Sequence, residues 1–188
     1  MTQDEALALH RTGASIFLTG QPGSGKTHTV NRYVRELQRQ GIDYAHTAST
    51  GIAATHGHGF TIHAWSGIGV RETLTRRDLD VLSTNRRLAA RIEKTKVLII
   101  DEISMLPARA LSLVDAVCRH IRGQQAPFGG LQMVLVGDFF QLPPVVRRDH
   151  DESMLQLSGG SDAFGAEFAH NSPAWRDLAP TVCYLSEQ

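Results

Sequence analysis

Residues 20–27, Gly-Gln-Pro-Gly-Ser-Gly-Lys-Thr, constrain this chain more than any other stretch. They match G-x-x-x-x-G-K-[ST], the pattern of a phosphate-binding loop. Glycines at positions 20, 23 and 25 allow backbone conformations that are closed to other residues, so successive N–H groups can point into one concavity. Lys26 can then reach the β- and γ-phosphates of a nucleotide, and the Thr27 hydroxyl can ligate Mg²⁺. The alternative is a glycine-rich turn that matches by chance. With Gly at about 7% of residues, that is expected in well under about one chain in a hundred of this length.

The sequence on either side of the loop supports a nucleotide site. Upstream, residues 14–19 form a short apolar run of strand length. Downstream, residues 27–40 carry apolar side chains at helical spacing, and Gly41 is a stop signal. A helix that starts near Lys26 adds its positive N-terminal end to the loop. Strand, glycine-rich loop and helix together predict binding of ATP with Mg²⁺.

A second signal is a pair of carboxylates after an apolar strand. Residues 97–100 (Val-Leu-Ile-Ile) are typical of a central parallel strand buried on both faces. Asp101 and Glu102 follow at its C-terminal end, where ligands bind in open α/β sheets. Asp101 can hold Mg²⁺, directly or through water, and Glu102 can orient or deprotonate an attacking water. A purely structural role has no use for adjacent acids there. We therefore expect an α/β fold with a central, mostly parallel sheet flanked by helices on both faces.

Later segments extend the same edge of the expected sheet. Residues 131–136 read as another buried strand. Gln141 follows it and is placed to sense a γ-phosphate, in a loop that Pro143 and Pro144 stiffen. Over residues 147–162 the composition shifts to charge, Ser and Gly, which we interpret as a mobile loop.

Residues 48–55 (Ala-Ser-Thr-Gly-Ile-Ala-Ala-Thr) predict a loop of small side chains and hydroxyls that turns into a helix. Such side chains suit close approach to a phosphate backbone. His56, His58 and His63 follow, but a zinc site needs a fourth ligand and no Cys or carboxylate lies nearby. His63 and Trp65 could instead contact a nucleic acid base or sugar, or they could pack within an ordinary helix.

The charge of the chain limits how it can hold a polyanion. Its formal net charge is zero, so a polyanion must be bound by a local patch. Residues 71–96 contain eight Lys or Arg against four acids and form the clearest basic stretch. A patch of this kind and a solvated helix face explain that stretch equally well.

The remaining composition favours one domain inside the cell. The 188 residues are enough to bury a core. Cys118, on the apolar face of a helix expected over 107–122, and Cys183 lie far apart and form no Cys-x-x-Cys motif, which indicates a reducing, intracellular (cytoplasmic) setting. The acidic start lacks a signal core, and no apolar run approaches about 20 residues, so we expect no membrane span. Gln3, ahead of the first strand, could hydrogen-bond an adenine edge or simply be solvated.

Five stretches together resemble the Pif-one (petite integration frequency) family of superfamily 1 DNA helicases: residues 20–27, 47–65, 98–106, 127–145 and, more weakly, 168–175. The second is close to a family signature, Thr-Ala-Ser-Thr-Gly-Ile-Ala-Ala followed by Thr-Ile-His. The fourth runs from Pro-Phe-Gly-Gly to Gly-Asp-Phe-Phe-Gln-Leu-Pro-Pro-Val and is more specific still. Generic phosphate-loop proteins lack both. The weak fifth match departs from the family at His170, where another aromatic is usual.

The resemblance implies a role for each matched position. Lys26, Glu102 and Gln141 would be catalytic, and Thr27 and Asp101 would be metal ligands. Thr50, Gly51 and His63 would contact single-stranded DNA. The residues expected to bind nucleotide are Gln3, Gly20, Gly23, Ser24, Gly25, Lys26, Thr27 and His28.

The resemblance also implies a domain organisation. Residues 1–188 would be the first, N-terminal RecA-like domain of an ATP-dependent 5′→3′ DNA helicase that acts in repair, recombination, replication and telomere maintenance. Family members have a second RecA-like domain that supplies an arginine finger, and the family pattern would continue beyond Gln188. We expect a monomer that works with that second domain. A nucleotide- and DNA-binding module without useful turnover is the alternative. A nucleotide kinase or loader ATPase is disfavoured by residues 47–65.

Overall fold

A central parallel sheet organises the molecule. The computed structural model describes residues 1–51, 59–140 and 168–186. Within them the sheet has six strands in the order β3-β2-β4-β5-β1-β6, and every neighbouring pair is parallel. The strands are β1 (Ile16–Gly20), β2 (Tyr44–Ala48), β3 (Phe60–Thr61), β4 (Val97–Asp101), β5 (Gln132–Val136) and β6 (Thr181–Leu185). The expected parallel α/β sheet is confirmed.

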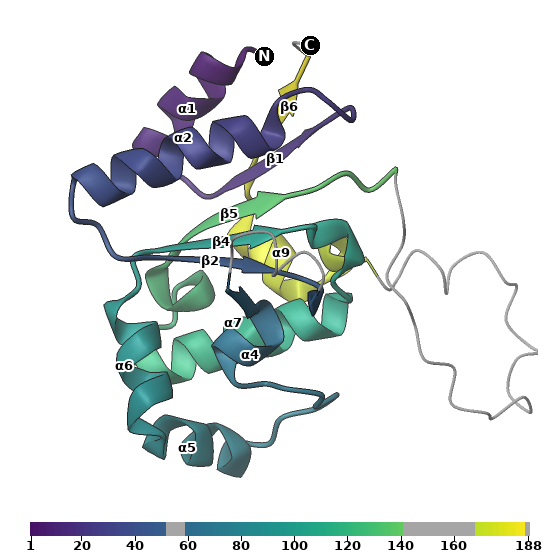
Figure 1. Ribbon diagram of the computed structural model, residues 1–188. Coiled ribbons are helices and arrows are strands. Elements are labelled where there is room, and N and C mark those ends of the chain that lie inside the picture. The colour runs from purple at the N-terminus through teal and green to yellow at the C-terminus, as the bar shows by residue number, and fades with distance from the viewer. Residues whose placement is uncertain (52–58, 141–167, 187–188) are drawn as a thin grey trace, which may run out of the picture.

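One face of the sheet is covered by α1 (Gln3–Arg11) and α2 (Lys26–Arg39), as Figure 1 shows. Alternate residues of the central strands, such as Ile16 and Leu18 of β1, point toward these helices and are fully buried. Thr2 and Glu5 cap the start of helix α1: the Thr2 side chain accepts from the Glu5 N–H, and the Glu5 side chain accepts from the Thr2 N–H. This reciprocal cap satisfies two N–H groups that a helix start otherwise leaves unpaired.

The other face carries the larger core. Phe17, Leu98 and Ile100, the residues that alternate with those of the first face, pack there beneath the helices. Because both faces are covered, the central strands read as continuous apolar runs rather than as alternating ones. The helices of this face are α4 (Ile62–Ser66), α5 (Arg76–Thr84), α6 (Arg86–Lys94), α7 (Ala108–Arg122) and α9 (Pro173–Leu178), with short 3-10 turns η1 (Ile103–Met105), η2 (Pro127–Gly130) and η3 (Ala169–Asn171).

The basic stretch 71–96 forms two short helices on this second face. Thr75 caps α5 and Asn85 caps α6. Leu82 and Leu88 are buried in the core, whereas Arg86 and Arg87 are exposed. Cys118 of α7 is buried, as expected, and Cys183 of β6 is buried as well.

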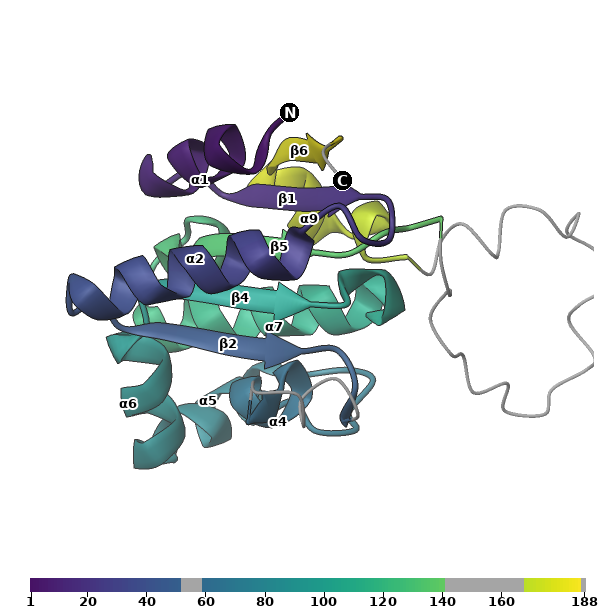
Figure 2. The same ribbon diagram turned by 45° about the horizontal axis from the view of Figure 1, so that its top comes forward.

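Parallel strands bring all their carboxyl ends to one edge of the sheet, and Figure 2 shows this edge beside the loop that follows β1. The phosphate-loop motif, Thr50 and Gly51, the Asp101–Glu102 pair and Gly137 all follow strands at that edge. Gln141 and the expected mobile loop 147–162 lie outside the described residues. No described helix is long and apolar enough to cross a membrane.

Candidate nucleotide and single-strand site

The loop after β1 has the backbone geometry that its glycines predict. Gly25, which precedes α2, has a φ of +87°, a conformation that favours glycine. Gly20 is needed for a close approach: a Cβ there would lie 2.6 Å from the carbonyl oxygen of Leu185 on β6. The loop therefore lies close against β6, and it continues directly into the first turn of α2.

Lys26 lies inside this loop. Its Nζ donates to the carbonyl oxygens of Gly20 at 2.7 Å and Gln21 at 3.0 Å. The Ser24 side chain is buried, and its Oγ has no hydrogen-bond partner among the described residues. Thr27 and His28, in the first turn of α2, are exposed. The loop thus offers an ammonium group, hydroxyls and a helix N-terminus to an anion.

Gln3 lies against the same loop. It is the first residue of α1 and is half-buried. Its side-chain amide occupies the space that a Cβ at position 25 would need. Two contacts hold the start of α1 in place: the Met1 amino group donates to the Tyr184 carbonyl at 2.8 Å, and Arg32 of α2 pairs with Asp4 at 2.7 Å. The structure therefore brings Gln3 to the nucleotide loop rather than leaving it solvated.

Asp101 and Glu102 stand across the edge from Lys26. The Glu102 N–H donates to Asp101 Oδ1 at 3.0 Å, and Glu102 has a φ of +55°, which is uncommon for a residue with a Cβ. Burial raises the pKa of Glu102, the neighbouring Asp101 charge raises it further, and Lys26 lowers it. The influence of Lys26 on this carboxyl places the loops after β1 and β4 in one electrostatic site.

Two neighbours of the acidic pair were not identified from the sequence. Ser49, after β2, donates its Oγ to the Glu102 carbonyl at 2.7 Å, and its N–H donates to the Asp101 carbonyl at 3.1 Å. His46 is a residue of β2, and its Nε2 lies 3.9 Å from Asp101 Oδ2. A histidine two residues before the end of an otherwise uncharged strand was the available signal for His46.

Phe139, after β5, joins this edge to the second core. Gly137 lets the loop lie against η1, because a Cβ there would be 3.0 Å from Ile103 Cγ2. The Phe139 ring then meets four aromatic side chains, with centroid separations from 4.5 Å to 5.8 Å. We call this the aromatic cluster; it comprises Phe17, Phe139, Phe168, His170 and Trp175. His170, the departure from the family pattern, therefore still supplies a ring.

The residues expected to contact DNA follow two neighbouring strands and lie at the same carboxyl edge of the sheet. Thr50 and Gly51 follow β2, and His63 is the second residue of α4, directly after β3. Burial lowers the pKa of His63 and favours its neutral form. Trp65 is only 2% exposed, so the packing alternative is confirmed for that residue.

In the ranges that the structure describes, no group of three His, Cys, Asp or Glu side chains could hold a metal ion. His56 and His58 lie outside those ranges, so the expectation about a zinc site at His56, His58 and His63 is not tested.

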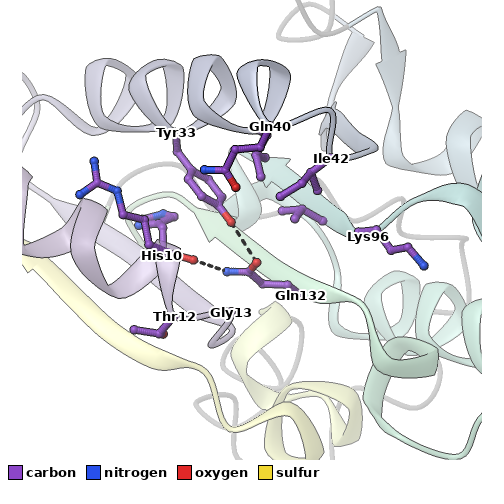
Figure 3. Close-up of a pocket in the computed structure, with 11 residues that line it drawn as sticks. His10, Thr12, Gly13, Tyr33, Gln40, Ile42, Lys96 and Gln132 are labelled. Atoms are coloured by element: carbon purple, nitrogen blue, oxygen red, sulfur yellow. Dashed lines mark hydrogen bonds between the residues drawn. The ribbon is translucent and has the colours of Figure 1, made fainter.

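A pocket of about 390 Å³ opens at the opposite edge of the sheet, between α1, α2 and the starts of β4 and β5 (Figure 3). Gln132 spans it: Tyr33 Oη donates to Gln132 Oε1 at 2.9 Å, and Gln132 Nε2 donates to the His10 carbonyl at 2.8 Å. None of the expected nucleotide or DNA residues lines this pocket. Gln132 links α1 and α2 to the sheet at the end away from the phosphate loop.

Comparisons with known proteins agree with this geometry. A family model described as PIF1-like helicase matches residues 4–162. The chain is 50% identical to the ATP-dependent DNA helicase Pif1 of Psychrobacter over 188 residues, which is 100% of this chain and 27% of that protein. It is 34% identical to the PIF1 helicase of Candida albicans over 98% of this chain and 20% of that protein. The chain therefore spans about a quarter of the length of these curated relatives.

Solved structures give the same result. The crystal structure of Pif1 helicase from Candida albicans superposes with a TM-score of 0.82 at 32% identity, covering 97% of this chain and 38% of that one. Bacteroides Pif1 bound to single-stranded DNA superposes with a TM-score of 0.70 at 27% identity, over 97% of this chain and 40% of that one. The expected RecA-like fold is thereby confirmed. Because a family model matches residues 4–162, most of its length, the chain belongs to the PIF1-like helicase family.

Proposed function

We propose that residues 1–188 form the first RecA-like motor domain of an ATP-dependent 5′→3′ DNA helicase that acts on single-stranded DNA. The observation that carries the proposal is that the phosphate-loop motif after β1 and the Asp101–Glu102 pair after β4 lie at the same carboxyl edge of the sheet, where the Lys26 charge lowers the pKa of Glu102. The names of the relatives support it: they are called ATP-dependent DNA helicases, and Bacteroides Pif1 has been solved with ADP-AlF4 and with single-stranded DNA.

In this proposal the nucleotide is held by the loop after β1. Lys26 and the loop N–H groups bind the β- and γ-phosphates, Ser24 and His28 border them, and Gln3 reads the adenine edge. Thr27 and Asp101, a hydroxyl and a carboxylate, are oxygen ligands of the type that Mg²⁺ prefers. When bound, Mg²⁺ would neutralise charge on the phosphates.

Glu102 is the proposed general base. A carboxylate whose pKa is raised is a stronger base, so it accepts a proton from water more readily than an ordinary carboxylate does. Glu102 lies near Lys26, and Gln141, in the segment after β5, would sense the γ-phosphate. Gln141 would then couple the γ-phosphate to the DNA-facing part of the same edge.

Thr50, Gly51 and His63 are the proposed single-strand contacts. Small side chains and hydroxyls allow the backbone to approach phosphates closely, and phosphate contacts carry no sequence information. We therefore assign to this edge a sequence-independent interaction. Roles in DNA repair, recombination, replication and telomere maintenance, and an intracellular location as a monomer, belong to the same proposal.

A test should separate nucleotide binding from DNA binding. We expect Mg²⁺-dependent binding of a fluorescent ATP analogue by the 188-residue chain and loss of that binding in Lys26→Ala. Lys96→Ala is the matched control, because Lys96 is exposed and lines the pocket at the opposite edge. Equal affinity in wild type and Lys26→Ala would refute the nucleotide site.

The DNA half is tested by fluorescence anisotropy with labelled oligonucleotides. Binding to single strands should be weak and should fall shallowly with salt, since few cations contact phosphate. Tighter binding to duplex than to single strands would contradict the proposal.

A further inference from the structure

Phe60 is a half-exposed aromatic side chain at the lateral side of the sheet. It is the first residue of β3, an outermost strand, and 51% of its surface is exposed. Phe60 pairs with Thr47 of β2, and the next residue, Thr61, caps α4 with its side chain. Phe60 therefore lies two residues before the helix that carries His63.

Arg91 of α6 covers part of the Phe60 ring. Its guanidinium carbon lies 5.7 Å from the ring centroid, within the range of a cation–π contact. Arg91 Nη2 donates to the Ala64 carbonyl of α4 at 3.2 Å, which fixes the guanidinium beside the ring. No carboxylate pairs with Arg91 within the described residues, and its Nε has no acceptor there. The positive charge is thus held in place without being neutralised by an acid.

The surroundings favour a polyanion. Helix α6 carries Arg86 and Arg87, both exposed, and Glu93 is its single acid. In a chain of zero net charge, such a local excess is where a nucleic acid would be attracted. The sheet order also places β3, which contains Phe60, next to β2, which Thr50 and Gly51 follow. Phe60, Thr50 and Gly51 thus form a row across two neighbouring strands.

We propose that Phe60, backed by Arg91, is a stacking platform for one base of the bound single strand. Stacking on an aromatic ring accepts every base, because every base has a π face. The platform would therefore add affinity without sequence preference, at the end of the row farthest from the phosphate loop. This inference rests on the proposed single-strand function of the same edge.

The experiment compares a dT oligonucleotide with an abasic oligonucleotide of equal length, using the 188-residue chain and fluorescence anisotropy. Phe60→Ala should weaken binding of dT by roughly 5- to 100-fold, the loss expected for one base–aromatic stack, and should leave abasic binding unchanged. Phe60→Trp should retain the affinity, and dT but not the abasic strand should quench its added fluorescence. Tyr184→Ala is the matched control, since Tyr184 is a 47% exposed aromatic on the opposite edge strand.

The outcomes separate the two proposals. If wild type binds dT and Phe60→Ala binds it equally well, or loses abasic binding to the same extent, the platform is refuted while the single-strand site stands. The same holds if Phe60→Trp keeps its fluorescence on dT. If wild type binds neither oligonucleotide, the single-strand function fails and the platform fails with it.

Discussion

At the scale of single residues, the site depends on side chains whose properties are set by close neighbours. Glu102 combines a left-handed backbone with a carboxyl whose pKa is raised, and Lys26 is held by two loop carbonyls. The groups proposed for phosphate binding and for proton transfer are therefore positioned by the protein alone.

Glu102→Gln should keep ATP binding and reduce ATP turnover by roughly 10²- to 10⁴-fold, the usual contribution of a general base. Because the pKa of Glu102 is raised from 4.5, the active carboxylate is lost as pH falls through that raised value, so the acid limb of turnover should lie above pH 4.5. The pH profile of turnover checks this. A Gln variant with wild-type turnover would contradict the role.

The raised pKa of Glu102 also makes stability depend on pH, in the opposite direction to a carboxylate whose pKa is lowered by folding. The folded state holds the Glu102 proton more tightly than the unfolded state, so stability falls as pH rises through the interval above 4.5. Glu102→Gln cannot ionise and should remove this pH dependence. Thermal melts of the two proteins across that interval measure the difference.

Asp115 illustrates a residue that supports the fold beneath the site. Its carboxylate accepts from the buried Phe128 N–H at 2.6 Å and from Arg119 Nε at 2.9 Å. Asp115→Ala leaves both donors unpaired and should lower the free energy of unfolding by about 3 kcal/mol. Asp177→Ala, which removes an exposed partner of the same Arg119, should cost less than about 1 kcal/mol. Equal urea midpoints for the two variants would contradict this assignment.

At the scale of elements, the loop after β5 is fixed by rings from distant parts of the chain. Phe139 contacts Phe17 of β1 and Trp175 of α9, and η3 lies between this loop and η1 after Glu102. The aromatic cluster therefore connects the elements that follow β4 and β5. We expect it to hold the start of the segment that contains Gln141.

Two adjacent phenylalanines provide a matched test of the aromatic cluster. Phe139→Leu loses the ring contacts and should lower the free energy of unfolding by about 1–3 kcal/mol. Phe140 is 98% exposed, so Phe140→Leu should change it by less than about 0.5 kcal/mol. Chemical denaturation of both variants decides, and similar losses in the two would show that Phe139 is not held by its ring.

At the scale of the whole molecule, the nucleotide site is expected to need an arginine from outside this domain. Arg11 pairs with Glu36 and Arg32 with Asp4, both on the α1–α2 layer, while Arg71 donates to the Gly67 and Ile68 carbonyls. Phosphoryl transfer needs the charge on the γ-phosphate neutralised, and an arginine finger is worth roughly 10³–10⁵ in rate. We therefore expect the 188-residue chain to bind nucleotide but to turn it over slowly unless an arginine is supplied from elsewhere.

We expect the 188-residue chain to hydrolyse ATP at least about 10³-fold more slowly than the full-length Psychrobacter relative, and to unwind no duplex. Turnover of both proteins with and without single-stranded DNA, and strand separation on a forked duplex, are the measurements. Comparable rates would contradict the expectation and would mean that the chain self-associates to supply its own arginine.

Much of the fold and part of the site could be predicted from the sequence because they depend on local patterns. Residues 20–27 specify a phosphate loop through glycine positions, and four apolar residues before Asp101 specify a strand buried on both faces. Parallel strands then bring both motifs to one edge. Boundaries shifted only slightly, as for the strand expected over 131–136 and found at Gln132–Val136.

Only the tertiary structure decided which distant residues meet. Gln3 reaches Gly25, Trp65 enters the core, His46 lies beside Asp101, and Arg91 stacks on Phe60. Such contacts depend on the strand order and on how helices pack across each face, and neither is encoded in a local pattern. The sequence by itself therefore determined which chemistry the edge can hold, whereas packing between remote segments determined the neighbours, burial and pKa of the groups that carry it.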